Sequence, residues 1–539
     1  MSKKILIMLV AVVTGAFMAS VAVAADSVSS DGSYSFLGYR TRLEITGTVA
    51  TSGQTAGTIL NPEGKGDALI AAYYDVRAVN NMYGVPKAQD TYFAIINENI
   101  DKVQIQALDD HNGVAAKLRF REWDKSEEVF DIDIWLSDND VWVGVLTRNP
   151  VNGLTRLWSP DYVIIAGLVN GPTFTVTKTN ELSMGSGMDF FTDWAPGGAN
   201  NAVSPPTGFT AADLTNMGYF EVIGEERTYT NVYQATATSP IYVTRVPGNR
   251  DFQDCLNSLS AYVYIVRVDD GVSLGYNAAA IANFSKNIGS LYYGPGAVSP
   301  DLADDCEDGL DQLEFELSKE LVYHGYSVET EINARFSQIV TFPTKHFHFE
   351  KHSPRRLDYT LCAATSADPT RVCTAIGAPF IGSTANYGEQ VEVTIFDRNE
   401  NKYSPTVGFW SPRTTPTLSL PWEVNVVGLY PGAVPTVPAI GNRNNVAWTT
   451  GTPGFPSGWL WINLHTNVIS SVAFHHGDSP HKNTNPHFGH LGNEFESYSG
   501  MPALSLALQE FSNANVGGAY GVIFPAFYRV HWDLVHLVN

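Results

Sequence analysis

Long apolar runs, positive charge and cysteine are all scarce in this chain of 539 residues, and each shortage excludes a class of protein. Lysine and arginine number 33 against 55 aspartate and glutamate residues, which gives a formal net charge of −22. Such a negative surface repels phosphate backbones, so nucleic-acid binding is disfavoured. Beyond residue 25 no segment offers about 18 consecutive apolar residues, and we therefore expect no membrane-spanning helix.

The sequence motifs of familiar catalytic sites are missing or stand in an unsuitable setting. H-E-x-x-H is absent, and no glycine-rich phosphate loop precedes a helix. The G-x-S-x-G pattern of a nucleophile elbow does occur from Gly271 to Gly275, around Ser273, but the strand-like residues beside it favour a hairpin turn. A non-enzymatic protein is therefore favoured, and a secreted hydrolase is the less favoured alternative.

Residues 1–25 have the pattern of a secretory signal peptide. Lys3 and Lys4 precede an apolar run, and Ala22-Val23-Ala24 supplies an A-x-A cleavage site. We therefore expect export to the cell surface or the extracellular space, with the periplasm as an alternative.

Only four cysteines occur, and they are Cys255, Cys306, Cys362 and Cys373. An even number in an exported protein predicts two disulfides. Pairing in sequence order is favoured because each bridge then closes a loop within one domain, although four cysteines permit three connectivities. Thiolate zinc sites are disfavoured because no C-x-x-C pair exists.

Alternating apolar and polar residues dominate Asp90 to Leu146 and predict adjacent antiparallel strands with one buried face. In the central run two aspartates oppose three apolar residues: Asp131 and Asp133 against Phe130, Ile132 and Ile134. Further strand-like runs follow at irregular intervals, separated by proline-rich connectors. The pattern predicts a mainly β fold of two antiparallel β-sandwich-like domains with long loops and one short helix.

We predict a first β-rich domain at 26–330 and a second, β-sandwich-like domain at 331–539. The first contains a loop insertion at 185–215, rich in Gly, Pro, Ser and Asn, and a helix at 301–321 with leucines at helical spacing. Acidic residues cluster at the start of that helix, where the helix dipole favours them. Calcium binding there is the alternative, but the EF-hand pattern fails.

Several segments resemble, in the same order, a group of uncharacterised secreted β-rich surface proteins of Gram-negative bacteria. The segments include TYFAIIN, GYFEVI, VTFPTKHFHFE, LPWEVNVV and PALSLALQEF, and the resemblance covers most of residues 70–525. These motifs are strand cores and turns. The resemblance implies export and a shared fold, and it carries no activity over to particular residues.

Two groups of histidines are candidate ligands for zinc or copper. In a strand over Thr344 to His352, three histidines would share one face with Glu350: His346, His348 and His352. A second group lies in a loop rich in glycine and proline: His475, His476, His481, His487 and His490. The plainer alternatives are a half-exposed strand for the first group and a polar surface loop for the second.

The sequence thus favours an exported structural or interaction protein that contacts other surface proteins or the extracellular matrix, or associates with itself. A secreted metal-binding protein that uses the loop at 475–490 is the alternative. Four tryptophans would stack on sugars if exposed, although buried positions are favoured for them: Trp194, Trp410, Trp459 and Trp461.

Overall fold

The computed structural model describes only part of the chain. The described residues are 59–80, 86–98, 112–124, 126, 128–167, 173–178, 187–190, 210–229, 241–245, 257–269, 271–282, 284, 294–295, 300–302, 313–314, 316–329, 332, 334–346, 389–400, 402–403, 417–420, 422–430, 444–447, 456–464, 494–513, 518–529 and 531–536. All four cysteines and seven of the eight candidate metal-binding histidines lie outside these ranges. The predicted disulfides and the loop at 475–490 therefore stay predictions.

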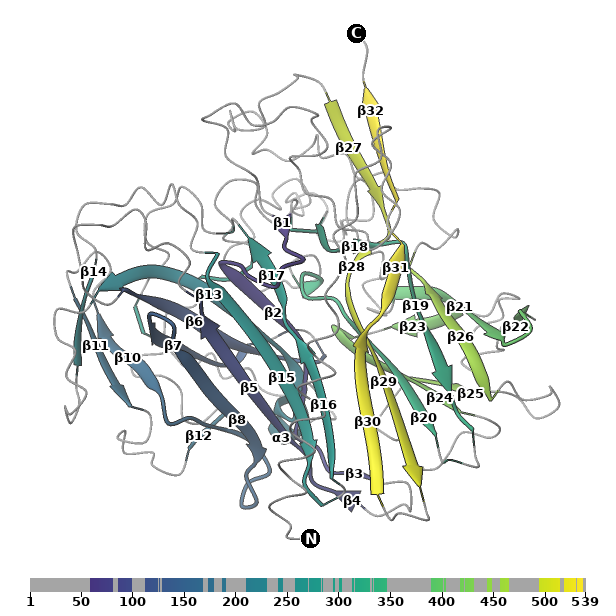
Figure 1. Cartoon of the computed structure of the whole chain (residues 1–539), viewed down its shortest axis with the longest axis horizontal. Helices are drawn as coiled ribbons and strands as arrows, with labels where there is room; N and C mark the ends of the chain where they lie inside the picture. Colours follow the sequence, from purple (N-terminus) through teal and green to yellow (C-terminus); the bar gives the residue numbers. More distant parts are fainter. Residues whose placement is uncertain are drawn as a thin grey trace, which may run out of the picture. The chain divides into compact units, whose positions relative to one another are not determined.

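The fold is mainly β, with antiparallel sheets in sandwich-like layers and one short helix, which confirms the predicted fold class (Figure 1). The first sheet runs in the order β1 (Ile59–Leu60), β17 (Ala279–Ala282), β2 (Ala68–Asp75), β13 (Met217–Tyr229), β14 (Ile241–Arg245), β11 (Thr173–Lys178), β10 (Tyr162–Gly167), β7 (Glu128–Ser137) and β6 (Asn112–Glu122). The second runs in the order β12 (Met188–Asp189), β9 (Thr155–Trp158), β8 (Val141–Arg148), β5 (Asp90–Asn97), β15 (Leu259–Arg267) and β16 (Val272–Asn277).

Two further sheets are built mostly from the C-terminal half of the chain. The third runs in the order β22 (Lys402–Tyr403), β21 (Glu389–Asp397), β26 (Ser457–Asn463), β19 (Leu321–Ser327) and β31 (Phe527–Arg529), with β23 (Thr417–Leu420) also paired to β21. The fourth runs in the order β25 (Asn444–Ala447), β24 (Val424–Tyr430), β20 (Arg335–Thr341), β29 (Leu504–Asn513) and β30 (Gly518–Pro525). Its β24–β25 pair is parallel.

Three short pairs complete the described strands: β3 (Val79–Asn80) with β4 (Pro86–Lys87), β18 (Ser318–Lys319) with β28 (Met501–Pro502), and β27 (Glu494–Ser499) with β32 (His531–His536). The helix α3 (Ala211–Thr215) lies inside the segment that the sequence predicted as a loop. Thr210 caps it, because its hydroxyl accepts from the Asp213 amide while the Asp213 carboxylate accepts from the Thr210 amide. Within 301–321, Leu313, Glu314, Glu316 and Leu317 are helical, and strand β18 follows at once.

The first and second sheets enclose an apolar core rich in aromatic rings. Phe120 of β6 lies 5.2 Å from Phe220 of β13 and 5.9 Å from Phe93 of β5, measured between ring centroids. Phe130 of β7 stacks on Phe190 at 5.0 Å. The apolar face predicted for the strands within Asp90 to Leu146 is therefore the face that builds this core.

Two adjacent strands of the fourth sheet, β20 and β29, contribute to the cores on both faces of the sheet. Ile339 and Leu506 belong to the first core, while their chain neighbours Val340 and Ala507 belong to a second core shared with the third sheet. Alternate side chains of a strand point to opposite faces, so each of these strands contributes to both cores. The Thr341 hydroxyl, which donates to the Ala72 carbonyl at 2.6 Å, also links β20 to β2.

Strand β13 holds the first sheet together, since it pairs with β2, β6 and β14. The strand order therefore returns to β13 through β6, β7, β10, β11 and β14. As a result, the second face of β7 is buried as well as the first. The sequence interpretation of one buried face was wrong here, because it could not include the pairing of β13 with both β6 and β14.

Gly218 of β13 lies close against the backbone of β6, and it offers a test of that pairing. A Cβ atom there would overlap the backbone carbonyl of Arg121. We expect Gly218→Ala to lower the free energy of unfolding by about 1–3 kcal/mol, because backbone cannot move aside as a side chain can. Gly325→Ala is the control, since the atom nearest to its added methyl group would lie 3.7 Å away. Urea unfolding of both variants measures the difference, and equal losses would contradict this placement.

Candidate binding surface

The outer face of the third sheet carries exposed aromatic side chains. In β26 the residues alternate, so that Leu460 and Ile462 enter the second core while Trp459 and Trp461 point outward. These tryptophans are 46% and 37% exposed. Neither Trp194 nor Trp410 belongs to the described part of the chain. The exposure that sugar stacking requires is thus present at Trp459 and Trp461.

The pairing of β26 with its neighbours brings further rings to the two tryptophans. Tyr323 of β19 lies opposite Trp461 and opposite Phe527 of β31. Its ring centroid is 6.1 Å from that of Trp461, 6.3 Å from that of Trp459 and 5.7 Å from that of Phe527, on which it stacks. Phe396 of β21 adds a ring 4.7 Å from Trp461. The third sheet therefore carries five connected rings, with Tyr323 in contact with three of the others.

His324 lies on the other face of β19 from Tyr323, beside the second core, and its ring connects Phe527 to the fourth sheet. Its imidazole stacks on Phe527 at 5.8 Å and on Phe524 of β30 at 5.5 Å. Burial among these rings lowers the pKa of His324, so the imidazole is neutral at ordinary pH. We call the seven connected residues the aromatic strip: Tyr323, His324, Phe396, Trp459, Trp461, Phe524 and Phe527.

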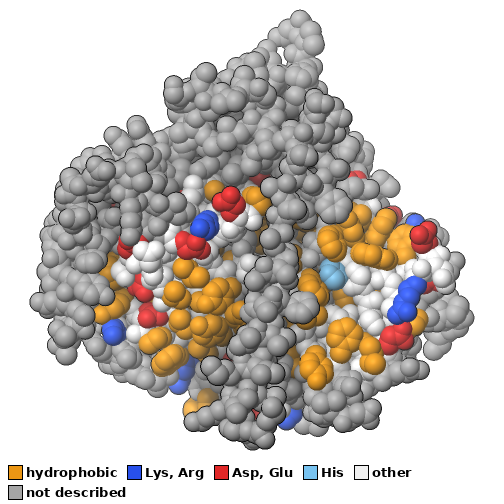
Figure 2. All heavy atoms as spheres, viewed as in Figure 1, with side chains coloured by type: hydrophobic (Ala, Val, Ile, Leu, Met, Phe, Trp, Pro, Cys, Tyr) orange, Lys and Arg blue, Asp and Glu red, His pale blue; other side chains and the backbone are white. Residues whose placement is uncertain are grey.

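The strip continues along β30 through Val522 and Tyr520, which are exposed on the same side as Phe524. With half-exposed rings that each offer about 200 Å² of surface, the exposed apolar area is roughly 500 Å². Figure 2 shows hydrophobic side chains gathered over β19 and β26, and a second group over β5 and β15. An exposed apolar patch of this size is commonly a binding site.

Polar groups flank the strip at both ends. Thr394 pairs with Trp461, and Glu392 pairs with Asn463, two residues further along β26 and on the same face. At the other end, the Arg398 guanidinium lies 3.5 Å from the Glu329 carboxylate, which also accepts from the Ser457 hydroxyl at 3.4 Å. A ligand on the rings would therefore find hydrogen-bonding groups at either side.

A separate cluster of charged side chains is buried inside the first sheet, on the face of β6 and β7 opposite the aromatic core. We call it the buried ionic cluster: Lys117, Arg119, Arg121, Glu128, Asp131, Asp133, Glu221 and Glu225. Lys117 Nζ lies 3.0 Å from Asp131 Oδ2 and also contacts Asp133. Arg119 pairs with Glu128 at 2.6 Å and Arg121 with Glu221 at 2.7 Å. Acids outnumber bases here by five to three.

Burial shifts the acids of this cluster toward the protonated form. It raises the pKa of Glu128 to about 7 and that of Asp133 to about 6, although nearby cations oppose the change. The pKa of Glu225 rises well above its usual range, for the same reason and because Asp133 is close. The side chains of Lys117 and Asp133 are inaccessible to solvent. The cluster can hold protons, but at its centre Lys117, Asp131 and Asp133 are at most 1% exposed and offer almost no surface to a substrate.

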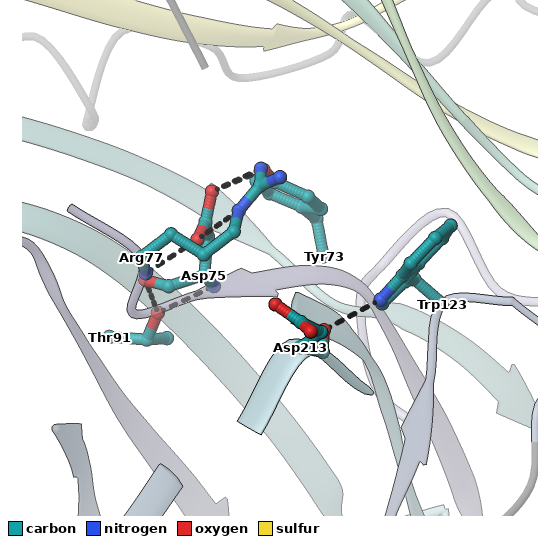
Figure 3. Close-up of polar contacts among 6 residues, drawn as sticks. All are labelled: Tyr73, Asp75, Arg77, Thr91, Trp123 and Asp213. Carbon is teal, nitrogen blue, oxygen red and sulfur yellow. Dashed lines mark hydrogen bonds and ion pairs between the residues drawn. The ribbon is translucent and has the colours of Figure 1, made fainter. Parts of the chain in front are cut away.

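A cavity of about 250 Å³ lies between β13 and β24, with Trp123 and Trp422 among its apolar walls and Arg77 and Asp213 among its polar ones. Figure 3 shows how Arg77, Trp123 and Asp213 are held. Arg77 binds the Asp75 carboxylate through Nε and Nη2 at 2.9 and 2.8 Å, and the Trp123 indole donates to the Asp213 carbonyl at 2.9 Å. The cavity is smaller than ordinary ligand pockets, and we assign it a structural role.

His346 is the one candidate metal ligand within the described ranges. Strand β20 ends at Thr341, a turn follows at 343–345, and His346 comes next in helical conformation, 6% exposed. The predicted strand therefore ends before the histidines begin, which corrects the expectation that His346 sits on a strand face. His348 and His352 lie outside the described residues, as do all five histidines of the loop at 475–490. In the described part of the chain, no three His, Cys, Asp or Glu residues form a group that could hold a metal ion.

Ser273 lies exposed on β16, in an antiparallel hairpin with β15. Strand β17 follows this hairpin, so the strand-turn-helix setting of a nucleophile elbow is not formed. The predicted hairpin is confirmed. Among the described residues, no helix has the length and apolar character needed to cross a bilayer.

The aromatic strip was not predicted from the sequence as a unit. The alternation Trp459-Leu460-Trp461-Ile462 could have signalled a strand with aromatic residues on one face. It could not show which face is outward, nor that residues near 323, 396 and 527 would join it. Comparison with known proteins adds nothing, because no family model, curated protein or solved structure matches the chain. The family resemblance therefore remains a prediction.

Proposed function

We infer that this protein is an exported, non-enzymatic binding protein that contacts partners outside the cell through the aromatic strip. The observation that carries the proposal is the contiguity of the rings, in which partly buried rings such as Phe396 and Tyr323 join four exposed ones: Trp459, Trp461, Phe524 and Phe527. Isolated surface aromatics are common, but a connected set is rare on a protein that has no partner. Aromatic residues are also those enriched at the centres of interfaces.

The construction of the strip also supports a binding role. The outward rings of β19, β21 and β26 stand on paired strands whose opposite faces are packed in the second core, so they are held in place before a partner arrives. Preorganised groups lose less conformational entropy on binding than mobile ones. A surface like this suits recognition, and it needs no catalytic residue.

Cell fractionation tests this function directly. We expect the wild-type protein to remain with the outer surface or extracellular layer of the cells that export it. The double variant Trp461→Ala and Phe527→Ala should appear mainly in the medium, because it loses two of the rings that make contact. Trp158→Ala is the matched control, since Trp158 is 42% exposed and belongs to the second sheet.

Quantitative immunoblotting of the cell-associated and released fractions measures the outcome, and circular dichroism confirms that each variant is folded. A wild-type protein that is wholly released as a monomer would contradict the proposal. Equal release of the strip variant and the Trp158→Ala control would contradict it as well.

A further inference from the structure

The rings of the aromatic strip form a regular row across the third sheet. Trp461, Tyr323 and Phe527 come from three adjacent strands and lie in register with one another. Their centroids follow at 6.1 and 5.7 Å, somewhat more than the separation of roughly 4.8 Å between neighbouring strands. The planes of Trp461 and Tyr323 differ by 53° and those of Tyr323 and Phe527 by 27°, so the row is a twisted series of apolar platforms whose order is set by the pairing of the strands.

Sugar rings match such platforms in chemistry and in repeat. A pyranose has a face of C–H groups that carry partial positive charge, and the face of an aromatic ring is negative. In an extended chain of β-linked sugars, one unit follows the next at a distance similar to the strand separation. Successive sugars can therefore lie over successive rings, each with its C–H face against one ring.

A sugar also needs hydrogen bonds for its equatorial hydroxyl groups, and the flanks of the row supply them. Thr394 continues the row beyond Trp461, in register with it on β21, and the Glu392–Asn463 pair lies next to it. Ser457, Glu329 and Arg398 lie at the Trp459 end. These groups include hydroxyl, amide, carboxylate and guanidinium, so both donors and acceptors are present.

The charge of the protein selects among polysaccharides and weighs against self-association. The seven residues of the strip carry no charge at neutral pH, since burial keeps His324 neutral. The whole chain carries a formal net charge of −22, which repels anionic polymers and also a second copy of itself. An uncharged polysaccharide is not repelled by this negative charge.

We propose that the aromatic strip binds an uncharged, β-linked polysaccharide, with consecutive sugar rings stacked on Trp461, Tyr323 and Phe527. This proposal rests on the binding function inferred above and gives that function its ligand class. The polymer is one that the exported protein meets outside the cell, in an extracellular layer or on a neighbouring surface.

Isothermal titration calorimetry of the full exported chain with hexasaccharides of β-linked glucose, N-acetylglucosamine and xylose tests the proposal. Co-sedimentation with insoluble cellulose and chitin extends the test to polymers. We expect wild-type protein to bind at least one of these probes. Trp461→Ala should weaken that binding about tenfold or more, and Trp158→Ala should change it less than twofold. Tyr323→Phe, which keeps the ring, should bind nearly as well as wild type.

The outcomes separate this proposal from the one on which it rests. If wild type binds none of the probes, but Trp461→Ala with Phe527→Ala still frees the protein from the cell surface, the ligand class is wrong and the binding function stands. Loss of cell association after protease treatment of the surface would then identify a protein partner. If neither assay responds to the strip variants, both proposals fail. Equal effects of Trp461→Ala and Trp158→Ala on sugar binding would also overturn the ligand assignment.

Discussion

Replacing Lys117 with methionine is expected to lower the free energy of unfolding by about 3–5 kcal/mol, as removal of one partner from a buried ion pair does. The ammonium group lies between Asp131 and Asp133, and none of the three side chains is more than 1% exposed. Without it, two buried carboxylates repel one another with no cation between them. Guanidinium unfolding followed by tryptophan fluorescence at pH 7 measures the loss.

Two comparisons show whether the loss comes from buried charge. Arg398→Ala breaks the exposed ion pair with Glu329 and should cost less than about 1 kcal/mol. In Lys117→Met combined with Asp131→Leu and Asp133→Leu, no charge of that group remains, and most of the stability should return. If Lys117→Met costs less than about 1 kcal/mol, the carboxylates are not held as the structure places them.

Glu225→Gln is expected to stabilise the protein at pH 8 by more than about 1.4 kcal/mol, the equivalent of one pKa unit, and to change little at pH 4. Glu225 is the extra residue at a bulge in β13, and neither of its buried oxygens has a hydrogen-bond partner within the described structure. Burial raises the pKa of this carboxyl well above its value in the unfolded chain. The folded protein therefore keeps the proton in a pH range where the unfolded chain releases it.

The sign of this effect follows from proton linkage. Where the folded state binds more protons than the unfolded state, the free energy of unfolding falls as the pH rises. Full stability is therefore present below the unfolded pKa, near 4.5, and it is lost as the pH rises toward the folded pKa. Glutamine has no proton to lose, so the difference between the two unfolding curves should grow from pH 4 to pH 8. A difference that is constant with pH would mean that Glu225 is not buried as a protonated acid.

Much of the strand content could be predicted from the sequence because alternation is a local signal. Phe130 and Ile132 were placed on the core face, with Asp131 opposite, and the structure has them so. The burial of Asp131 could not be predicted, since it depends on pairing between β13 and β6 about 100 residues apart. The same alternating sequence pattern is expected for an aspartate on a solvent-exposed sheet face and for one that is buried because distant strands pair around it.

The aromatic strip shows the same limit for function. The composition of β26 revealed the tryptophans, but burial was the favoured interpretation because large apolar residues are usually inside. Their exposure follows from the second core, which Leu460 and Ile462 fill from the other face of the same strand. Which of two apolar faces is covered is decided by the sheet that packs against it, and that sheet lies elsewhere in the sequence.

The contribution of β20 and β29 to both cores has a consequence for how the protein can be divided. A fragment that ends before β20 would expose the side of the first core that Ile339 and Leu506 now cover. A fragment that begins after β17 would leave those same side chains facing water. Neither half is therefore a minimal unit for expression. Heat should melt both cores in one transition, and the rings of the aromatic strip keep their positions only while the whole molecule is folded.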